Sequence, residues 1–509
     1  MKALDLIIIF GYLIGIVLFG TWFGRKQKTT SDYFLGDRSV PWWAVAFSIV
    51  ATETSTITFI SVPGIAFARG GNFQFLQLVF GYLLGRVVIS ILFIPSYFRG
   101  ELLTVYQLLD RRFGGKIKML AASLFIVMRN IADGIRLLLT AIVLAAVYAA
   151  FQPGANVETI TIASIVLIGV AMIIFTYFGG MEAVIWVEVV QLGIYIAGAI
   201  AAAVVLINSI EGGFAGASAL ARQFGKYSVL DFAFDYTKTY TFWSGLIGGC
   251  FLTMSTHGTD QYLVQRYLCT NRSRHATIAL LTSGAIVLVQ FIGFLFVGVL
   301  LFAFYQPFTD PAYATAASAT FPFTSGDRVF PDFITKHMPS GLSGLVVAAI
   351  FAAAMSSSLN SIAATAVNDL YKPFRPARSD KHYLKVSHLL TLIWGVVQIG
   401  VAFAVRNQPG SALSKALSIA SLINGPILGV FLVGTFLRRV SQPPALIGML
   451  VSIVSMLYIF FLRPEIAWTW YVLLGSSITF VVAWLSSFAF RPAPAEMRDE
   501  LSPVVATED

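Results

Sequence analysis

The sequence of 509 residues carries very little charge: only 12% of its residues are Asp, Glu, Lys or Arg, whereas 57% are hydrophobic. Soluble proteins usually contain about 25% charged residues, so an ordinary soluble protein is excluded. The apolar runs last about 20 residues, whereas the strands of a transmembrane barrel alternate polar and apolar residues over about 10. The sequence therefore predicts an all-α integral membrane protein.

Motifs of reaction chemistry are also scarce. The two cysteines, Cys250 and Cys269, provide neither a disulfide framework nor a CxxC metal site. No HExxH or GxSxG motif occurs, and no aspartates pair on facing spans, which argues against a membrane enzyme built, for example, on Ser356 and His257. Repeating filter sequences and rings of charge are absent too, which argues against a channel. We expect no cofactor.

Apolar stretches long enough to cross a bilayer recur along the whole chain. About thirteen predicted spans lie near residues 4–23, 41–67, 72–98, 117–151, 158–177, 182–208, 240–268, 276–306, 341–370, 383–404, 411–437, 444–462 and 467–490. We therefore expect one transmembrane domain over residues 1–490 and a disordered cytoplasmic tail over residues 491–509. Two longer connections, 209–239 and 307–340, suggest short surface helices or packed loops at the outer face.

The basic residues are distributed unevenly between the connections. Arg25, Lys26 and Lys28 follow the first span, and most of the 34 basic residues lie in alternate connections, whereas tips such as residues 152–156 are nearly neutral. By the positive-inside rule, this pattern predicts a plasma-membrane protein with its amino terminus outside and its carboxyl terminus in the cytoplasm. The net charge of +9 is therefore read as an orientation signal and not as a sign of nucleic acid binding.

Two spans, five apart in the order of spans, are interrupted by small polar residues. Residues 48–58 (SIVATETSTIT) surround Glu53, and residues 252–261 (LTMSTHGTDQ) surround His257. Broken helices at matching places in two halves are typical of inverted-repeat transporters, because unwound backbone is tolerated only where it lines a cavity. We expect two repeats of five spans, over about 41–208 and 240–437, with one further helix before them and two after.

Ionisable residues inside a membrane cost about 2.5 to 3.5 kcal/mol each on insertion scales, so they are functional candidates. Those in the predicted spans are Glu53, Arg86, Arg129, Asp133, Arg136, Glu188, His257 and Asp260. The spacing places Arg129, Asp133 and Arg136 on one helix face. Either these three neutralise one another, or Arg136 faces the cavity, where it balances Glu53 or binds an anionic substrate.

Five segments, taken in order, resemble one transporter family. They are residues 32–36 (DYFLG) ahead of 41–43 (PWW), 179–191 (GGMEAVIWVEVVQ), 260–267 (DQYLVQRY), 352–361 (AAAMSSSLNS) followed by 368–371 (NDLY), and 425–429 (GPILG). Together they resemble the sodium:solute symporter family, which includes the sodium/glucose, sodium/proline and sodium/sialic acid transporters. The resemblance covers nearly the whole chain and implies a LeuT-like inverted-repeat fold in a secondary active transporter, not an enzyme.

The resemblance also implies a site, position by position. The sodium ion would bind the backbone carbonyls of Ala51, Thr54 and Ala353 and the hydroxyls of Ser356 and Ser357. The substrate would contact Glu53, Ser55, Thr58, Gln77, Thr253, Thr256 and His257. Arg136 is added to these expected contacts because of its charge at membrane depth, not because of the resemblance. Thr256 stands where the sugar transporters have an aromatic inner gate, and Ser356 is closer in sequence to Asp369 than the family's pattern has it.

The number of sodium ions depends on a second site that some members have. Those members use an Asp in the sixth span and hydroxyls one turn beyond the serine pair. Here Glu188 stands at the acidic position and Leu359 and Asn360 at the others. Glu188 is thus a possible second-cation residue, but we expect one sodium ion.

These observations predict a sodium-coupled importer of a small polar organic solute that works by alternating access as a monomer. Two solute classes stay open: Glu53, Gln77, Thr253 and His257 suit a sugar or polyol, whereas Arg136 suits a carboxylate such as a sialic acid, an amino acid or a short organic acid. The alternative is a proton-coupled symporter of the same fold, in which Glu53 is the protonatable group.

Overall fold

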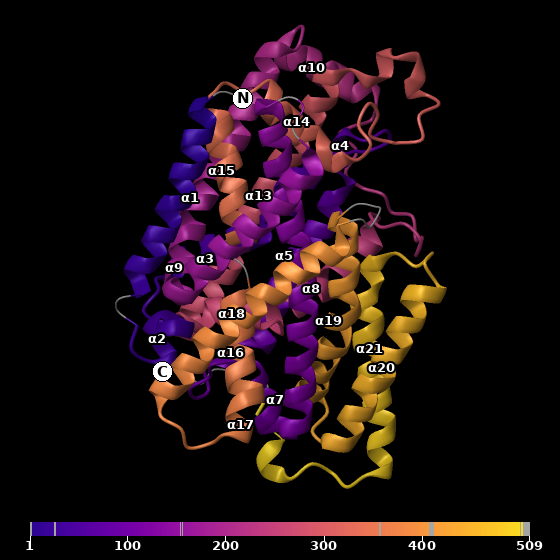
Figure 1. Ribbon diagram of the computed structural model, residues 1–509. Coiled ribbons are helices and arrows are strands. Elements are labelled where there is room, and N and C mark those ends of the chain that lie inside the picture. Colours follow the sequence, from indigo (N-terminus) through magenta and orange to yellow (C-terminus); the bar gives the residue numbers. More distant parts are fainter. Residues whose placement is uncertain are drawn as a thin grey trace.

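The computed structural model describes residues 3–24, 27–152, 154, 156–355, 358–406, 412–498 and 500–501. Within these ranges all regular structure is helical, so the prediction of an all-α protein is confirmed. The long helices are α1 (Ala3–Gly24), α5 (Leu76–Leu92), α8 (Gly115–Phe151), α9 (Val157–Ser209), α13 (Ser273–Tyr305), α18 (Asp380–Val405), α19 (Ala412–Phe436), α20 (Gln442–Leu462) and α21 (Tyr471–Ser486). In Figure 1 most of them run along the height of the molecule, whereas α18 crosses it obliquely, and α1 lies at one side and α20 and α21 at the other.

Shorter helices make up the remaining predicted spans and the two ends of the bundle. Those within spans are α3 (Trp42–Glu53), α4 (Thr56–Phe67), α6 (Ile94–Tyr97), α11 (Gly249–Gly258), α12 (Gln261–Leu268), α15 (Leu342–Met355) and α16 (Leu359–Thr365). The others are α2 (Thr30–Leu35), α7 (Tyr106–Phe113), α10 (Gly213–Gln223), α14 (Val329–Lys336) and α17 (Lys372–Phe374). The two long connections therefore contain the short α-helices α10 and α14, and the second also contains three 3-10 helices, Pro307–Thr309, Pro311–Tyr313 and Gly326–Arg328.

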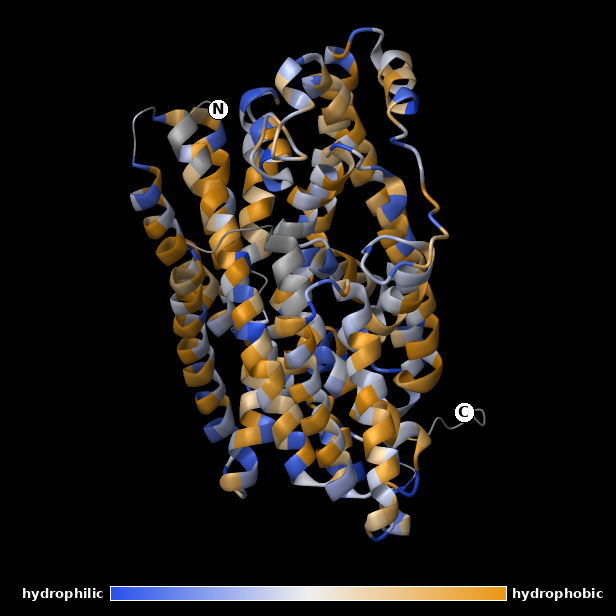
Figure 2. Cartoon of the chain, turned by 90° about the vertical axis from the view of Figure 1, so that its right-hand side faces the viewer, coloured by the Kyte–Doolittle hydropathy of each residue, from blue (hydrophilic) through white to orange (hydrophobic). Residues whose placement is uncertain are grey.

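The outer surface of the bundle is apolar. Ile14 is 60% exposed, Val289 70% and Phe461 70%, an arrangement that would be unfavourable in water but suits a lipid environment. Within the described ranges, seven helices are long and apolar enough to cross a membrane, and the pair α3 and α4 forms an eighth candidate. Figure 2 shows apolar residues along the lengths of the helices and polar residues more often near the two ends of the molecule. The chain is thus a multi-pass membrane protein.

The fifth and sixth predicted spans run together as α9, which is 53 residues long. Only Gly180 leaves the helical region, with φ 62° and ψ −167°, so two helices meet at this residue without a loop. This left-handed backbone conformation is essentially restricted to glycine. The sequence predicts a connection at residues 178–181, and the structure reduces it to a single kink.

The tail after residue 490 begins with a packed segment. The backbone N–H of Ala493 donates to the carbonyl of Arg439 at 3.0 Å, and Leu501 is fully buried beside Gly434 of α19. The tail predicted to be disordered therefore contacts the bundle over its first part. Residues 499 and 502–509 lie outside the described residues.

Candidate solute and sodium site

The second predicted span is broken between α3 and α4, whose axes are bent by 56°. Thr54, between them, has φ −81° and ψ 54°, outside the helical region. Threonine favours such a break because its hydroxyl competes for backbone groups, and the Thr58 hydroxyl donates to the Glu53 carbonyl at 2.7 Å. Among the described residues no hydrogen bond reaches the carbonyls of Ala51 or Thr54. Both oxygens are therefore available to a cation.

The seventh predicted span is broken between α11 and α12. The backbone N–H of Thr259 donates to the Ser255 carbonyl at 2.9 Å and ends α11. Asp260 then begins α12, because its Oδ1 accepts the backbone N–H of Tyr262 at 2.9 Å. The other oxygen of Asp260 forms an ion pair with Arg129 of α8. This break is thus held to a helix of the other half of the chain.

A cavity with a volume of about 190 Å³ lies between the two breaks. The described residues that line it are Thr52, Glu53, Ser55, Thr58, Val62, Phe75, Tyr82, Arg129, Ala132, Arg136, Leu252, Thr253, Thr256, His257, Tyr262, Leu263, Phe291 and Asn424. They include seven of the eight substrate contacts expected from the sequence, all except Gln77. Hydroxyl, carboxylate and guanidinium groups thus line the cavity together with aromatic rings, which suits a small polar solute.

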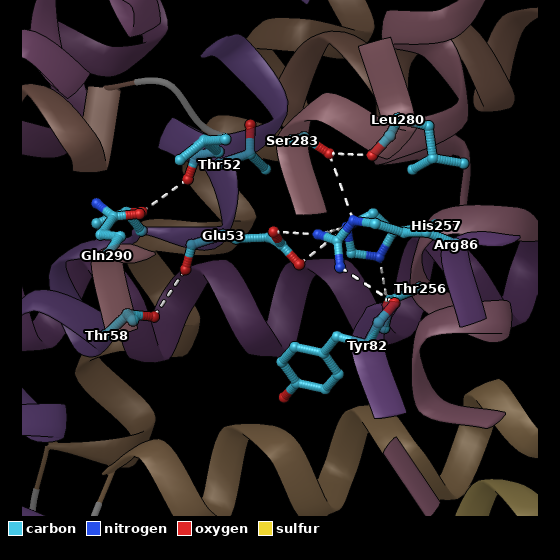
Figure 3. Close-up of polar contacts among 12 residues, drawn as sticks. Thr52, Glu53, Thr58, Tyr82, Arg86, Thr256, His257, Leu280, Ser283 and Gln290 are labelled. Atoms are coloured by element: carbon cyan, nitrogen blue, oxygen red, sulfur yellow. Dashed lines mark hydrogen bonds and ion pairs between the residues drawn. The ribbon is translucent and has the colours of Figure 1, made fainter. Parts of the chain in front are cut away.

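Glu53 is paired with Arg86 at the wall of this cavity, as Figure 3 shows. His257 Nε2 lies 3.0 Å from the other carboxylate oxygen of Glu53 and 3.3 Å from the Arg86 guanidinium. The alternative that Arg136 balances Glu53 is therefore wrong, because the carboxylate already has these two partners.

Arg86 is also the point at which several helices meet (Figure 3). From α5 it contacts Glu53 of α3, His257 of α11 and the Ser283 hydroxyl of α13, the last at 3.4 Å. Its side chain is 1% exposed, so it is enclosed by its surroundings. One buried cation thus fixes the ends of α3 and α11 relative to each other at the cavity.

Arg136 faces the same cavity from α8 with weaker partners. Its Nη1 lies 3.5 Å from Asp133 Oδ1 and 3.3 Å from the Tyr262 hydroxyl. Its buried Nε has no hydrogen-bond partner in the part of the chain that the structure describes. Arg129, in contrast, forms a direct ion pair with Asp260. Arg136 therefore keeps donor capacity for a carboxylate, which guanidinium groups bind with two parallel N–H bonds.

Gln77 lies away from the cavity. Its amide N–H groups donate to the carbonyls of Gln74 and Tyr240, each at 3.2 Å. Its amide oxygen accepts the backbone N–H of Asp231 at 2.9 Å. The expectation that Gln77 contacts the substrate is therefore corrected: this side chain fastens α5 to the connection that follows α10.

Glu188 is enclosed by partners as well. Its carboxylate lies 2.5 Å from Arg266 Nη2 and accepts the Thr52 hydroxyl at 3.1 Å and the Ser48 hydroxyl. Both charged side chains of the Arg266–Glu188 pair are fully buried. A cation next to Glu188 would face the Arg266 guanidinium, so the structure does not favour a second-cation site there.

The ninth predicted span contains α15, α16 and most of a π-helix, Ala366–Tyr371. Ala353 lies near the end of α15, whereas Ser356 and Ser357 lie outside the described residues. The Thr56 hydroxyl, in the first turn of α4, donates to the Ile350 carbonyl of α15 at 2.9 Å. This contact brings the first break next to the part of α15 that contains Ala353.

Several residues at the cavity are not assigned to the site from the sequence, among them the polar side chains of Arg86, Arg129, Tyr262 and Asn424. Arg86 and Arg129 were candidates because they are charged at membrane depth, but nothing in their spacing identifies Glu53 and Asp260 as their partners. Tyr262 belongs to the segment 260–267, and Asn424 directly precedes the segment 425–429.

Known proteins are similar to this chain in sequence and in fold. The model of the sodium:solute symporter family matches residues 33–452. A sodium/sialic acid symporter of Aliivibrio fischeri is 30% identical over 96% of this chain and 94% of its own length, and a sodium-coupled monocarboxylate transporter of Mus musculus is 28% identical over 89% and 72%. An outward-open, substrate-bound structure of a Na⁺-coupled sialic acid symporter superposes with a TM-score of 0.83 at 28% identity, covering 97% of this chain and 99% of that one. The expected fold is thereby confirmed.

Proposed function

The chain belongs to the sodium:solute symporter family, and from this premise we propose that it imports a small organic carboxylate together with sodium. It is a secondary active transporter that couples a small solute to sodium, and not an enzyme. We further propose the class of the solute, the position of the ion site and the direction of transport.

The proposal of a carboxylate as the solute rests on the surroundings of Arg136 in the cavity. Arg136 is the cavity guanidinium whose nearest carboxylate, Asp133, lies 3.5 Å away. A solute carboxylate would complete the hydrogen bonds of this group, whereas a plain sugar would leave them unmade. Thr253, Thr256 and His257, on the wall formed by α11, suit hydroxyl groups on the same solute. A sialic acid, a sugar that bears a carboxylate, combines both features, and the related proteins named above include transporters of sialic acid and of monocarboxylates.

The proposed sodium site lies beside the solute, where α3 ends. Carbonyl oxygens of broken helices coordinate sodium in transporters of this kind. The ligands would be the carbonyls of Ala51, Thr54 and Ala353 and the hydroxyls of Ser356 and Ser357. The carbonyls of Ala51 and Thr54, which accept no hydrogen bond from the described residues, and the contact from Thr56 to Ile350 support this position. We propose a single ion because Glu188 is paired with Arg266.

The mechanism follows from where the two ligands would lie. Sodium from outside would hold the broken end of α3 to α15, which completes the cavity for the solute. The two repeats, at about 41–208 and 240–437, would then rock to open the cavity to the cytoplasm. Low sodium inside the cell would release the ion and then the solute. Sodium and solute each favour the same occluded state, so each raises the affinity for the other. The proposed unit is a monomer with its amino terminus outside.

Uptake by the purified protein in proteoliposomes tests the solute class. The probes are radiolabelled N-acetylneuraminate, pyruvate and glucose, with and without an inward sodium gradient. We expect a carboxylate probe to accumulate, and accumulation to stop when the gradient is collapsed. Arg136→Gln should lower the affinity for that probe at least about tenfold, because it removes one partner of a buried charge pair worth about 2 kcal/mol or more.

Lys116→Gln is the matched control, because it removes an exposed charge from the same helix, α8. It should leave uptake at the wild-type level. Accumulation of glucose but of neither carboxylate, or a carboxylate affinity unchanged in Arg136→Gln, would contradict the proposal and favour the sugar or polyol class.

A further inference from the structure

Asp133 is a buried carboxylate that the transport site does not use directly. It lies on α8 between Arg129 and Arg136, it is 3% exposed, and it is not among the described residues that line the cavity. A solute in the cavity would touch Arg136 in front of it but not Asp133 itself.

The two oxygens of Asp133 point to different parts of the molecule. Oδ2 accepts the backbone N–H of Ser358 at 3.0 Å and also the Ser358 hydroxyl. The Gln398 amide of α18 lies 3.4 Å from the same oxygen. Oδ1 lies 3.5 Å from Arg136 Nη1 and accepts no hydrogen bond from the described residues. One carboxylate is thus shared between the residue before α16 and the cavity guanidinium.

Ser358 is the residue at which the ninth span resumes as α16. It directly follows Ser357, one of the proposed sodium ligands, in the sequence. The carboxylate of Asp133 therefore contacts the sodium-binding span with one oxygen and the solute-binding side chain with the other. The contacts of Asp133 thus join α8 to the start of α16, through Ser358, and to α18, through Gln398.

We infer that Asp133 is a positioning residue that couples the solute site at Arg136 to the sodium site through the start of α16. This inference rests on the proposed function, because it takes Arg136 as the group that meets a solute anion. In the empty cavity, the positive charge of Arg136 partly neutralises the negative charge of Asp133. A solute carboxylate at Arg136 replaces Asp133 as the partner of the cation, and the negative charge of Asp133 then acts on the sodium-binding span.

The sign of the effect follows from the charges. Release of Asp133 from Arg136 makes the start of α16 more negative, which favours a bound cation, so the solute raises the affinity for sodium. By thermodynamic reciprocity sodium raises the affinity for the solute by the same factor. Coupling factors between two sites are commonly roughly 5- to 150-fold, so the effect is large enough to measure.

The first test measures sodium affinity with no solute present, by titration of sodium onto the purified protein followed by its thermal unfolding. Arg136→Gln should bind sodium several-fold more tightly than the wild type, because Asp133 is no longer shared. Asp133→Asn should bind it several-fold more weakly. In Asp133→Asn the amide oxygen still accepts the N–H and hydroxyl of Ser358, so the break keeps its hydrogen bonds while the charge is lost.

The double variant separates coupling through Asp133 from simple repulsion across space. If Arg136 acts through Asp133, adding Arg136→Gln to the Asp133→Asn variant leaves the affinity for sodium unchanged. An equal gain in sodium affinity in both backgrounds would overturn the inference. Gln398→Leu, which removes only the 3.4 Å contact from α18, is the control variant and should leave the response to Arg136→Gln intact.

The second test uses N-acetylneuraminate as the solute probe. Its dissociation constant is measured at zero and at saturating sodium in the wild type and in Asp133→Asn. The sodium-induced gain in affinity should fall towards onefold in the variant, and an unchanged gain would contradict the inference. If no carboxylate binds the wild type, the proposed function fails, whereas the sodium measurements above still decide the role of Asp133.

Discussion

Glu53 lies at the carboxyl end of α3, where the unpaired carbonyls of the helix already create partial negative charge. A carboxylate is tolerated there because Arg86 and His257 contact it from α5 and α11. The sequence identifies these residues, since charge at membrane depth is rare. It does not identify the pairing, because Arg86 is 33 residues away from Glu53 and His257 is on a different repeat. The same holds for Arg129 and Asp260, which are 131 residues apart.

Replacement of Glu53 should therefore destabilise the protein through Arg86. Glu53→Gln leaves a guanidinium that is 1% exposed without its carboxylate. Removal of one member of a buried ion pair typically costs about 3 to 5 kcal/mol. We expect a clear fall in the melting temperature of the purified protein in detergent, and a loss of sodium-driven uptake.

A double variant shows whether the lost charge balance is the cause. Glu53→Gln with Arg86→Gln should melt at a higher temperature than Glu53→Gln alone, since no unpaired charge is then buried. If Glu53→Gln alone melts at the wild-type temperature and transports normally, Glu53 has no essential role and the Arg86 pair contributes little.

The breaks in the helices are the elements that sequence reasoning located best. Residues 48–58 and 252–261 are rich in side chains that compete with helical hydrogen bonds, and the structure ends α3 and α11 inside them. The junction within α9 differs from the prediction. The predicted spans 158–177 and 182–208 leave a connection that contains Gly179 and Gly180, but only Gly180 leaves the helix. A glycine pair signals a permitted turn, and packing decides whether the turn becomes a loop or a kink.

Gly180→Ala should distort this junction. An added Cβ would lie 2.4 Å from Gln27 Nε2 and 2.8 Å from the Tyr33 carbonyl oxygen, and Gln27 already donates to the Gly179 carbonyl at 2.6 Å. Strain of a non-glycine residue in this backbone region costs about 1 to 3 kcal/mol, to which the close contacts add. We expect a lower melting temperature and a loss of transport.

Gly193→Ala is the matched control within α9. A Cβ at this position meets no atom within 4 Å, and alanine favours a helix over glycine by about 1 kcal/mol. Its melting temperature should equal or exceed that of the wild type. A Gly180→Ala protein that is as stable as Gly193→Ala would show that the α9 junction does not depend on glycine.

At the scale of the whole molecule, the two ends of the bundle differ. In Figure 1, α10 and α14 lie at the end where the chain begins, whereas α2, α7 and α17 lie towards the opposite end. The basic residues of the sequence gather in the connections around α2, α7 and α17, and the segments 209–239 and 307–340 contain α10 and α14. By the positive-inside rule, the end with α2, α7 and α17 is expected to face the cytoplasm.

Labelling of single cysteines tests this orientation. Lys238 and Lys381 are both exposed, the first in the connection after α10 and the second in the first turn of α18. A membrane-impermeant maleimide added to intact cells should label Lys238→Cys at once and Lys381→Cys only after the membrane is permeabilised. The native Cys250 and Cys269 are buried, so the unmodified protein gives the background signal. Labelling of Lys381→Cys but not of Lys238→Cys in intact cells would reverse the proposed topology, and sodium would then enter the bundle from the end that carries α2, α7 and α17.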